Sequence, residues 1–242
     1  MAKRYHRKKL NQAIAAACLT VTAVPALLAT PAMAGTTVTS ATLHVASGDS
    51  YNYVQLNNSG SVVVENNGII QGGQGVLVTN SHTAGSITND TGGLIDASFT
   101  GILVVSSSGL TGGVTNNGVI TGGNVGILVS SGSTIGAITN NAGGHITGTS
   151  SAGIYVYGNS TTGAISNSGD IRGKYRGIYV GSNSTIGSIT NNVGGTIQAT
   201  SSSAGIYITE STVSGNISNS GTISGATGIY VASSTIGGDI TN

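Results

Sequence analysis

The sequence feature that most constrains the fold is an internal repeat of about 25 residues. A glycine followed by an aliphatic-x-aliphatic segment recurs at spacings of 26, 25, 27, 24, 28 and 23 residues. Long and short units alternate, so every second glycine lies 51 or 52 residues further along the chain. A fixed period of this kind indicates a solenoid whose units stack on their neighbours, and not a closed globular core. The repeated glycines are Gly75, Gly101, Gly126, Gly153, Gly177, Gly205 and Gly228.

Two further motifs repeat with the same period. One is an aliphatic-x-Asn series that begins at Val64, Ile87, Val114, Ile138, Ile165, Ile189, Ile217 and Ile240. The other is a Gly-x-Ile-x series centred on Ile95, Ile120, Ile146, Ile171, Ile197 and Ile223. Within each unit apolar residues alternate, as Ile154 and Val156 do around Tyr155, and the repeats lack the spacing of an amphipathic helix. The three motifs therefore predict three short strands in each repeat unit, which corresponds to one turn of the solenoid.

These observations predict an all-β fold, a parallel β-helix with about 25 residues and three short strands per turn. Because crossovers between parallel strands are right-handed, the coil should be right-handed. Residues 61–242 should form roughly seven turns, and residues 35–60, which are less regular, should form an N-terminal cap or an irregular first turn. The repeats are still running at Asn242, which predicts that this segment is truncated at its C-terminal end.

The N-terminal residues 1–34 have the layout of a Sec signal peptide. Five cations lie in the first ten residues, an apolar stretch of residues 13–29 follows, and Ala32-Met33-Ala34 forms a cleavage box. Cleavage there would leave three cations against seven acids, a net charge of −4.

Composition narrows the classes of function. Charged residues make up 6% of the chain, against about 25% in average domains, so the clustered cations of a nucleic-acid-binding protein are missing. A single cysteine excludes a disulfide framework. No zinc-type spacing, calcium-binding nonapeptide, nucleophile elbow or phosphate-binding loop leading into a helix is found. The sequence therefore predicts no cofactor, no metal and no catalytic residues.

One residue type recurs at the same corner of successive turns. Stacked asparagine amides can hydrogen-bond along the axis of a solenoid, and asparagine also tolerates the left-handed backbone of a tight corner. Pairs such as Gly143-Gly144 and Gly194-Gly195 allow positive φ and close packing. We interpret these residues as structural. The predicted ladder consists of Asn89, Asn116, Asn140, Asn167, Asn191 and Asn219.

Two outward-facing groups are candidates for binding. If Ile154 and Val156 point inward, Tyr155 points outward, and its equivalents continue a row that begins with leucines in earlier turns. This tyrosine strip, Tyr155, Tyr179, Tyr207 and Tyr230, suits glycan stacking or side-by-side association of rods, although tyrosine also simply favours strands. The densest charge group is the charged patch of Asp170, Arg172, Lys174 and Arg176, whose first three members should share the outer face of one strand region. An acidic glycan is a hypothetical ligand for it.

The signal layout followed by tandem Gly-x-Ile-Thr-Asn, Gly-x-Ile-x-Gly and Gly-Ile-Tyr-Val units resembles the passenger region of bacterial autotransporters, the type V secretion class. The resemblance covers residues 1–242. It implies a Gram-negative bacterium, export by the Sec machinery, and a place at the cell surface, in the outer membrane or outside the cell. It also implies a C-terminal β-barrel that crosses the outer membrane, to which no part of this chain corresponds.

Four readings of function follow. The first is a non-catalytic surface rod, an adhesin, self-association factor or spacer, with a host surface, a glycan or a second copy as partner. The second is a stalk for an enzyme domain absent from this chain. The third, a pectate-lyase-like enzyme, would need further carboxylates on turns adjacent to Asp170. The fourth is an ice- or surface-binding solenoid: Ser133-Thr134, Ser184-Thr185 and Ser234-Thr235 recur, but the sequence suggests no regular two-row threonine array.

Overall fold

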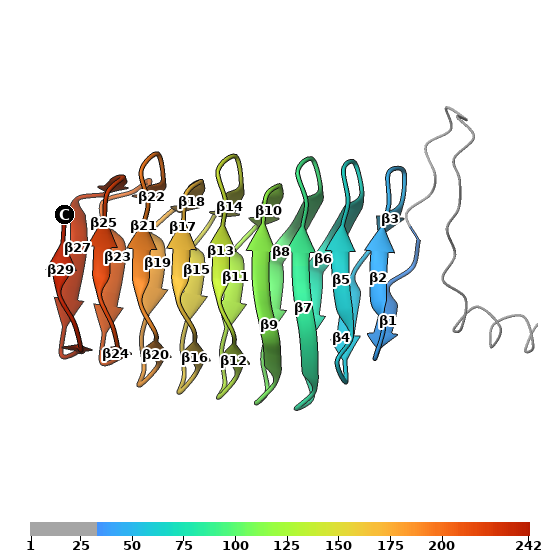
Figure 1. Ribbon diagram of the computed structural model, residues 1–242, viewed down its shortest axis with the longest axis horizontal. Helices are drawn as coiled ribbons and strands as arrows, with labels where there is room; N and C mark the ends of the chain where they lie inside the picture. The colour runs from blue at the N-terminus through green and yellow to red at the C-terminus, as the bar shows by residue number, and fades with distance from the viewer. Residues whose placement is uncertain (1–32) are drawn as a thin grey trace, which may run out of the picture.

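A computed structural model describes residues 33–242, and all regular elements in this range are β-strands. The strands form parallel coils stacked along one long axis (Figure 1), about eight turns of about 25 residues each. The predicted all-β parallel solenoid is thus confirmed, and its hand stays a prediction. The predicted signal peptide, except for Met33 and Ala34, lies outside the described residues.

The coils form two sheets that face each other across the core. Sheet A has 15 strands and sheet B has 14. Sheet A contains β1 (Thr36–Thr39), β3 (Ser50–Tyr51), β4 (Val54–Asn57), β6 (Ile69–Val78), β8 (Leu94–Val104), β10 (Val119–Gly122), β11 (Val125–Val129), β14 (His145–Gly148), β15 (Ala152–Val156), β18 (Asp170–Gly173), β19 (Arg176–Val180), β22 (Thr196–Ala199), β23 (Ala204–Thr209), β26 (Thr222–Ser224) and β27 (Thr227–Ala232). Sheet B contains β2 (Thr42–Val45), β5 (Ser61–Val64), β7 (Thr83–Asn89), β9 (Gly109–Asn116), β12 (Thr134–Ile135), β13 (Ile138–Asn140), β16 (Thr161–Thr162), β17 (Ile165–Asn167), β20 (Thr185–Ile186), β21 (Ile189–Asn191), β24 (Thr212–Val213), β25 (Ile217–Asn219), β28 (Thr235–Ile236) and β29 (Ile240–Thr241).

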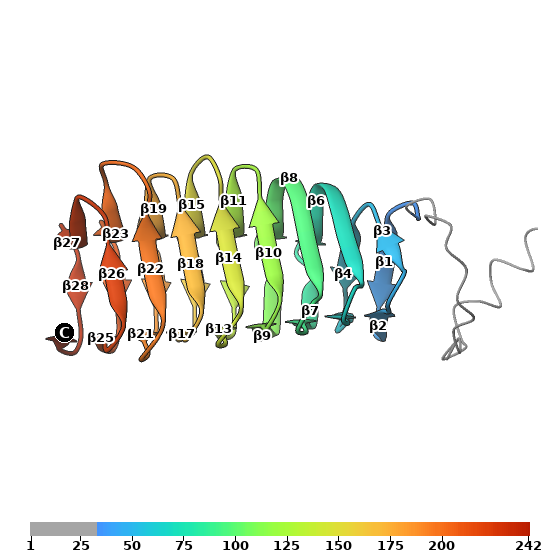
Figure 2. The same cartoon turned by 90° about the horizontal axis from the view of Figure 1, so that it is seen from above.

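A complete coil in the later part of the chain contributes two strands to each sheet. In one such coil, β15 and β18 lie in sheet A, while β16 and β17 lie in sheet B. Equivalent strands of successive coils pair with one another and form a column along the rod. Figure 2 shows one column of sheet A, with β10, β14, β18 and β22 side by side. All three predicted strand columns are present, and the structure adds a fourth, the two-residue column of β12, β16, β20, β24 and β28. The expectation of three strands per turn is therefore corrected to four in these coils. The fourth strand could not be predicted, because two residues are too few to show alternation.

The N-terminal segment is paired into the stack. Strands β1 to β4 lie within residues 35–60; β1 pairs in register with β4, and β2 pairs with β5. This additional coil is the reason why the structure has about eight turns where the repeats alone predict seven.

The core is built from columns of aliphatic side chains, one set per strand column. Ile146, Ile171 and Ile197 are mutual register partners in sheet A and have no exposed surface. Ile138 and Ile165 are likewise register partners in sheet B and have no exposed surface. Burying an aliphatic side chain of this size contributes about 1.5–3 kcal/mol, so repetition along the rod supplies the stabilisation that a round core supplies elsewhere.

The two corners between the sheets differ in the residues that take a left-handed backbone. Where the chain passes from sheet A to the short column of sheet B, residues such as Asn159 (φ 60°) and Asn183 (φ 59°) are left-handed. At the other corner, Gly143 and Gly194 take φ of 83°. None of the six predicted ladder asparagines has a positive φ. The expectation that left-handed backbone explains those asparagines is therefore wrong, since they end strands such as β13 and β17 instead.

Candidate functional site

The outer face of sheet A carries the tyrosine strip. Tyr155, Tyr179, Tyr207 and Tyr230 are register partners in β15, β19, β23 and β27. Their ring centroids are 4.4, 5.8 and 4.6 Å apart in turn, and the interplanar angles are 32°, 20° and 20°. The rings therefore stack on one another along the rod. Earlier coils continue this row with Leu128, whose register partner is Tyr155.

The charged patch meets the tyrosine strip at Arg176. The Arg176 guanidinium carbon lies 4.8 Å from the Tyr179 ring centroid and 4.6 Å from the Tyr207 centroid. Contacts of this kind contribute about 0.5–2 kcal/mol each, depending on how far the cation is desolvated. Two groups that were predicted separately thus form one surface across β18 and β19.

The other members of the charged patch differ in their partners. Asp170 Oδ2 accepts one hydrogen bond from Arg172 Nη2 at 3.3 Å and lies 3.2 Å from His145 Nδ1. Lys174 is exposed and lies beyond the end of β18, in the connection to β19, so it does not share the strand with Asp170 and Arg172. Its ammonium nitrogen lies 5.4 Å from the centroid of the exposed Tyr175 ring.

Partial burial perturbs two phenols of the tyrosine strip. Burial raises the pKa of the Tyr155 phenol above its ordinary value of 10.0, and the neighbouring Tyr179 phenol adds to the rise. Burial likewise raises the pKa of Tyr179, while the Arg176 charge acts in the opposite direction. The phenols of Tyr155 and Tyr179 are therefore held in the neutral form beyond the pH at which a free tyrosine ionises.

The predicted asparagines form one hydrogen-bonded line beneath a corner of the coil. The Nδ2 of Asn140 donates to Asn167 Oδ1, and the Nδ2 of Asn167 donates to Asn191 Oδ1, both at 2.8 Å. The line begins at Asn89 and passes through Asn116 and Asn219 in the same way. The amides also donate to backbone carbonyl groups, so the ladder ties each corner to the next coil.

A second line of buried hydrogen bonds was missed from the sequence. The backbone N–H of Ser133 donates to Ser160 Oγ, and that of Ser160 donates to Ser184 Oγ, both at 3.2 Å. The line also includes Ser108, Ser211 and Ser234. The recurring Ser-Thr pairs were the available signal, but serine is common in loops and does not by itself indicate burial.

The outer face of sheet B carries two rows of hydroxyl side chains. The first row is Thr134, Thr161, Thr185, Thr212 and Thr235, and its members are register partners. The second row is Thr88, Thr115, Thr139, Ser166, Thr190, Ser218 and Thr241. The sequence suggested no regular two-row threonine array; the structure shows one threonine row and a second row in which Ser166 and Ser218 interrupt the threonines. The two hydroxyl rows lie in different strand columns of sheet B, and the column of the first row was not predicted from the sequence.

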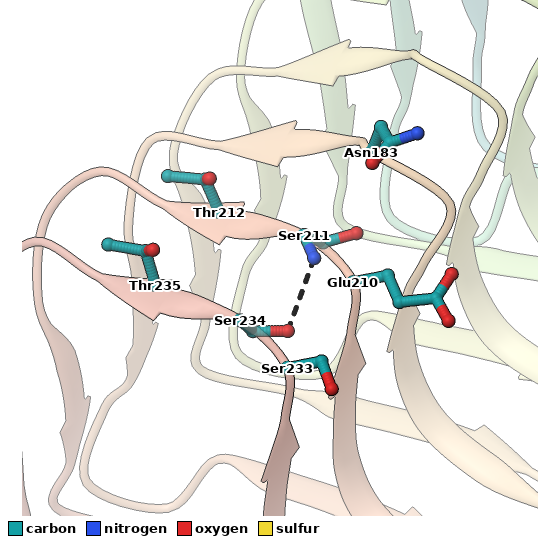
Figure 3. A pocket seen from close by; sticks show the side chains of 7 residues that line it. All are labelled: Asn183, Glu210, Ser211, Thr212, Ser233, Ser234 and Thr235. Carbon is teal, nitrogen blue, oxygen red and sulfur yellow. Dashed lines mark hydrogen bonds between the residues drawn. The ribbon is translucent and has the colours of Figure 1, made fainter.

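A shallow hollow lies at the corner near the C-terminal coils (Figure 3). The Ser211 N–H donates to Ser234 Oγ within it, and the hollow contains one carboxylate, Glu210, and no histidine. Residues 33–242 contain no cluster of three or more potential metal ligands. No helix long and apolar enough to span a membrane occurs among the same residues. The hollow is lined by Asn183, Glu210, Ser211, Thr212, Ser233, Ser234 and Thr235.

The fold defines the chain as a two-sheet parallel β-solenoid. Comparisons with family models, curated proteins and solved structures each find no match to it.

Proposed function

We propose that the chain is a non-catalytic, exported rod that acts at or beyond the cell surface, as an adhesin, a self-association factor or a spacer. The stacked coils support a rod-like role, because an extended solenoid offers long faces for binding and holds them rigidly. The resemblance to autotransporter passengers supports export through residues 1–34 and a separate β-barrel for the outer membrane.

The observation that carries an adhesive role is the difference between the two faces. From β9 to β25 the strands of sheet B contain no charged residue. Sheet A presents stacked tyrosines and the charged patch, and exposed aromatic groups with arginine are typical of binding surfaces. Attachment should therefore depend on sheet A.

Export and attachment can be tested separately. The chain fused at its C-terminus to alkaline phosphatase, which folds only outside the cytoplasm, should give active enzyme. A variant with Lys3, Arg4, Arg7, Lys8 and Lys9 all changed to Ser should lose that activity. Inactive phosphatase in the unaltered fusion would contradict export.

For attachment, the chain can be displayed on non-adherent bacteria by a heterologous outer-membrane barrel. Cells should then gain adhesion or aggregation, and the combined change of Tyr155, Tyr179, Tyr207 and Tyr230 to Ser should remove it. Export without any gain would favour the spacer role, or the alternative of a stalk for an enzyme domain. Equal adhesion by both proteins would remove the tyrosine strip from the proposal.

The hydroxyl rows favour a second candidate, binding to an ordered uncharged surface such as ice. Thr134 and Thr161 are exposed register partners, and the rows repeat at the strand spacing of about 4.8 Å. If this candidate is right, the purified chain should inhibit ice recrystallisation and Thr161→Lys with Thr185→Lys should abolish the effect. Unhindered crystal growth at high protein concentration would exclude it.

A further inference from the structure

Arg176 carries a charge that its surroundings fix in position but do not neutralise. The guanidinium contacts the rings of Tyr179 and Tyr207, and its buried Nε has no hydrogen-bond partner. It forms no ion pair within residues 33–242. A planar guanidinium held in this way keeps the donors of its two terminal nitrogens for a carboxylate or sulfate that arrives from outside, while the buried Nε stays out of reach.

The positive charge of the rod is concentrated around this side chain. Arg172, Lys174 and Arg176 are all the lysine and arginine of the described residues, which contain seven acids. Arg172 shares Asp170 with His145, whereas Lys174 contacts only the Tyr175 ring among its charged or aromatic neighbours in the described range. An otherwise acidic rod therefore has one basic site, and that site adjoins the tyrosine strip.

The same surface offers groups suited to sugars. Because the four rings stack on one another, the tyrosine strip presents a continuous row of ring edges and phenol groups along the rod. Tyr157 and Tyr175 are 43% and 46% exposed; the Tyr157 ring packs against Tyr155 at the strip, and the Lys174 ammonium lies over the Tyr175 ring. In the adjoining column, Thr147 and Gln198 are the register partners of Arg172 and add uncharged polar groups.

We propose that the tyrosine strip and the charged patch form one site that binds an acidic polysaccharide running along the rod. Acidic groups of the polysaccharide bind Arg176 and Lys174, and its hydroxyl groups bind the phenols. The proposal rests on the proposed function, because it names the partner of an adhesive sheet A. A nucleic acid fits less well, because nucleic-acid binding needs many clustered cations to match a charge about every 1.7 Å on duplex DNA, and the described residues contain three.

The test is binding of the purified full chain to four immobilised polymers: polygalacturonate, heparin, neutral dextran and single-stranded DNA. Polygalacturonate or heparin should bind, and rising salt should weaken that binding. Combined Lys174→Gln and Arg176→Gln should weaken it at least about tenfold, the equivalent of one or two lost charge-assisted bonds. The salt dependence should become less steep by about one unit per cation removed.

Matched variants separate binding from folding. Thr161→Gln with Thr185→Gln changes the opposite face and should leave binding unchanged, and circular dichroism should show β structure in every variant. Arg176→Lys keeps the charge without the planar stack, and should recover only part of the affinity. Tyr179→Phe keeps the ring and removes one phenol, so it should weaken binding less than Arg176→Gln does.

Equal binding by the wild type and the folded Lys174→Gln, Arg176→Gln variant would overturn the site. Equal retention of dextran would overturn the acidic ligand, and stronger retention of DNA would overturn the polysaccharide. These outcomes are distinct from failure of the proposed function. A chain that binds heparin but is not exported contradicts only the surface role, whereas an exported, adhesive chain that binds neither acidic polymer contradicts only this inference.

Discussion

At the residue scale, Thr162 occupies an inward position that its register partners fill with Ile135 and Ile186. Its side chain is 1% exposed, and its Oγ1 has no hydrogen-bond partner among the described residues. A buried hydroxyl without a partner costs free energy of folding, because water no longer satisfies it. The repeat thus tolerates one imperfect copy of its core motif.

Replacing Thr162 by Val should therefore stabilise the protein. The substitution keeps the side-chain shape and removes the unpaired hydroxyl, so the free energy of unfolding should rise by about 1 kcal/mol or more. Guanidinium denaturation of Thr162→Val measures the change. Thr161→Val, at the exposed neighbouring position, is the control and should stay within about 0.5 kcal/mol of wild type. A clear loss of stability in Thr162→Val would mean that the hydroxyl has a partner.

Replacing Asn167 by Leu should destabilise the protein. Its buried amide donates to Asn191 Oδ1 and accepts from Asn140 Nδ2, so the change removes one hydrogen-bond partner from each of two neighbouring amides. The expected loss is about 1–3 kcal/mol in the free energy of unfolding. Thermal melts of Asn167→Leu measure it, with Thr190→Ser on the outer face as a nearly neutral control. An unchanged melting temperature in Asn167→Leu would show that the ladder adds no stability.

The raised pKa values of Tyr155 and Tyr179 predict a loss of stability in alkali. A phenol whose pKa is higher in the folded state contributes stability at pH values below the unfolded pKa of about 10. That contribution is lost as pH rises through the higher folded value. Ultraviolet absorbance should show some tyrosines ionising late, and melting temperatures should fall above about pH 10. If Tyr155→Phe with Tyr179→Phe shows the same alkaline fall, other groups cause it.

At the scale of strands, the sequence predicted the columns whose motifs contain alternating aliphatic residues, and the structure confirms the parallel solenoid. The asparagines could be picked out because the same residue closes the same motif in every turn. The short column around Thr161 could not, because two residues show no periodicity. The contact between Arg176 and Tyr207 could not be predicted either, since it depends on which side chain bends toward the next coil.

At the scale of the whole molecule, each coil contacts mainly the coils next to it, so removing one entire coil should be tolerated. Deletion of residues 126–152 joins Val125 to Gly153 and keeps Ile154 in register with Ile102. The product should give an unchanged β spectrum by circular dichroism and a rod about 4.8 Å shorter. Deletion of residues 126–138 removes half a coil, places a sheet B segment in sheet A, and should unfold the protein. Equal folding of both deletions would contradict the stacked-coil arrangement.

The two faces of the rod differ chemically along its length: sheet B carries the hydroxyl rows, and sheet A carries the aromatic, basic site. The chain has no tryptophan and nine tyrosines, six of which lie on or beside the tyrosine strip. Intrinsic fluorescence therefore reports directly on the surface that we propose to be functional.

The most direct measurement is a titration of this tyrosine fluorescence with polygalacturonate and with heparin. If sheet A is the binding face, at least one of the two should produce a saturating change that salt reverses and that Lys174→Gln with Arg176→Gln abolishes. Fluorescence that stays constant while a separate assay shows the polymer bound would place binding elsewhere on the rod, and would contradict the central claim.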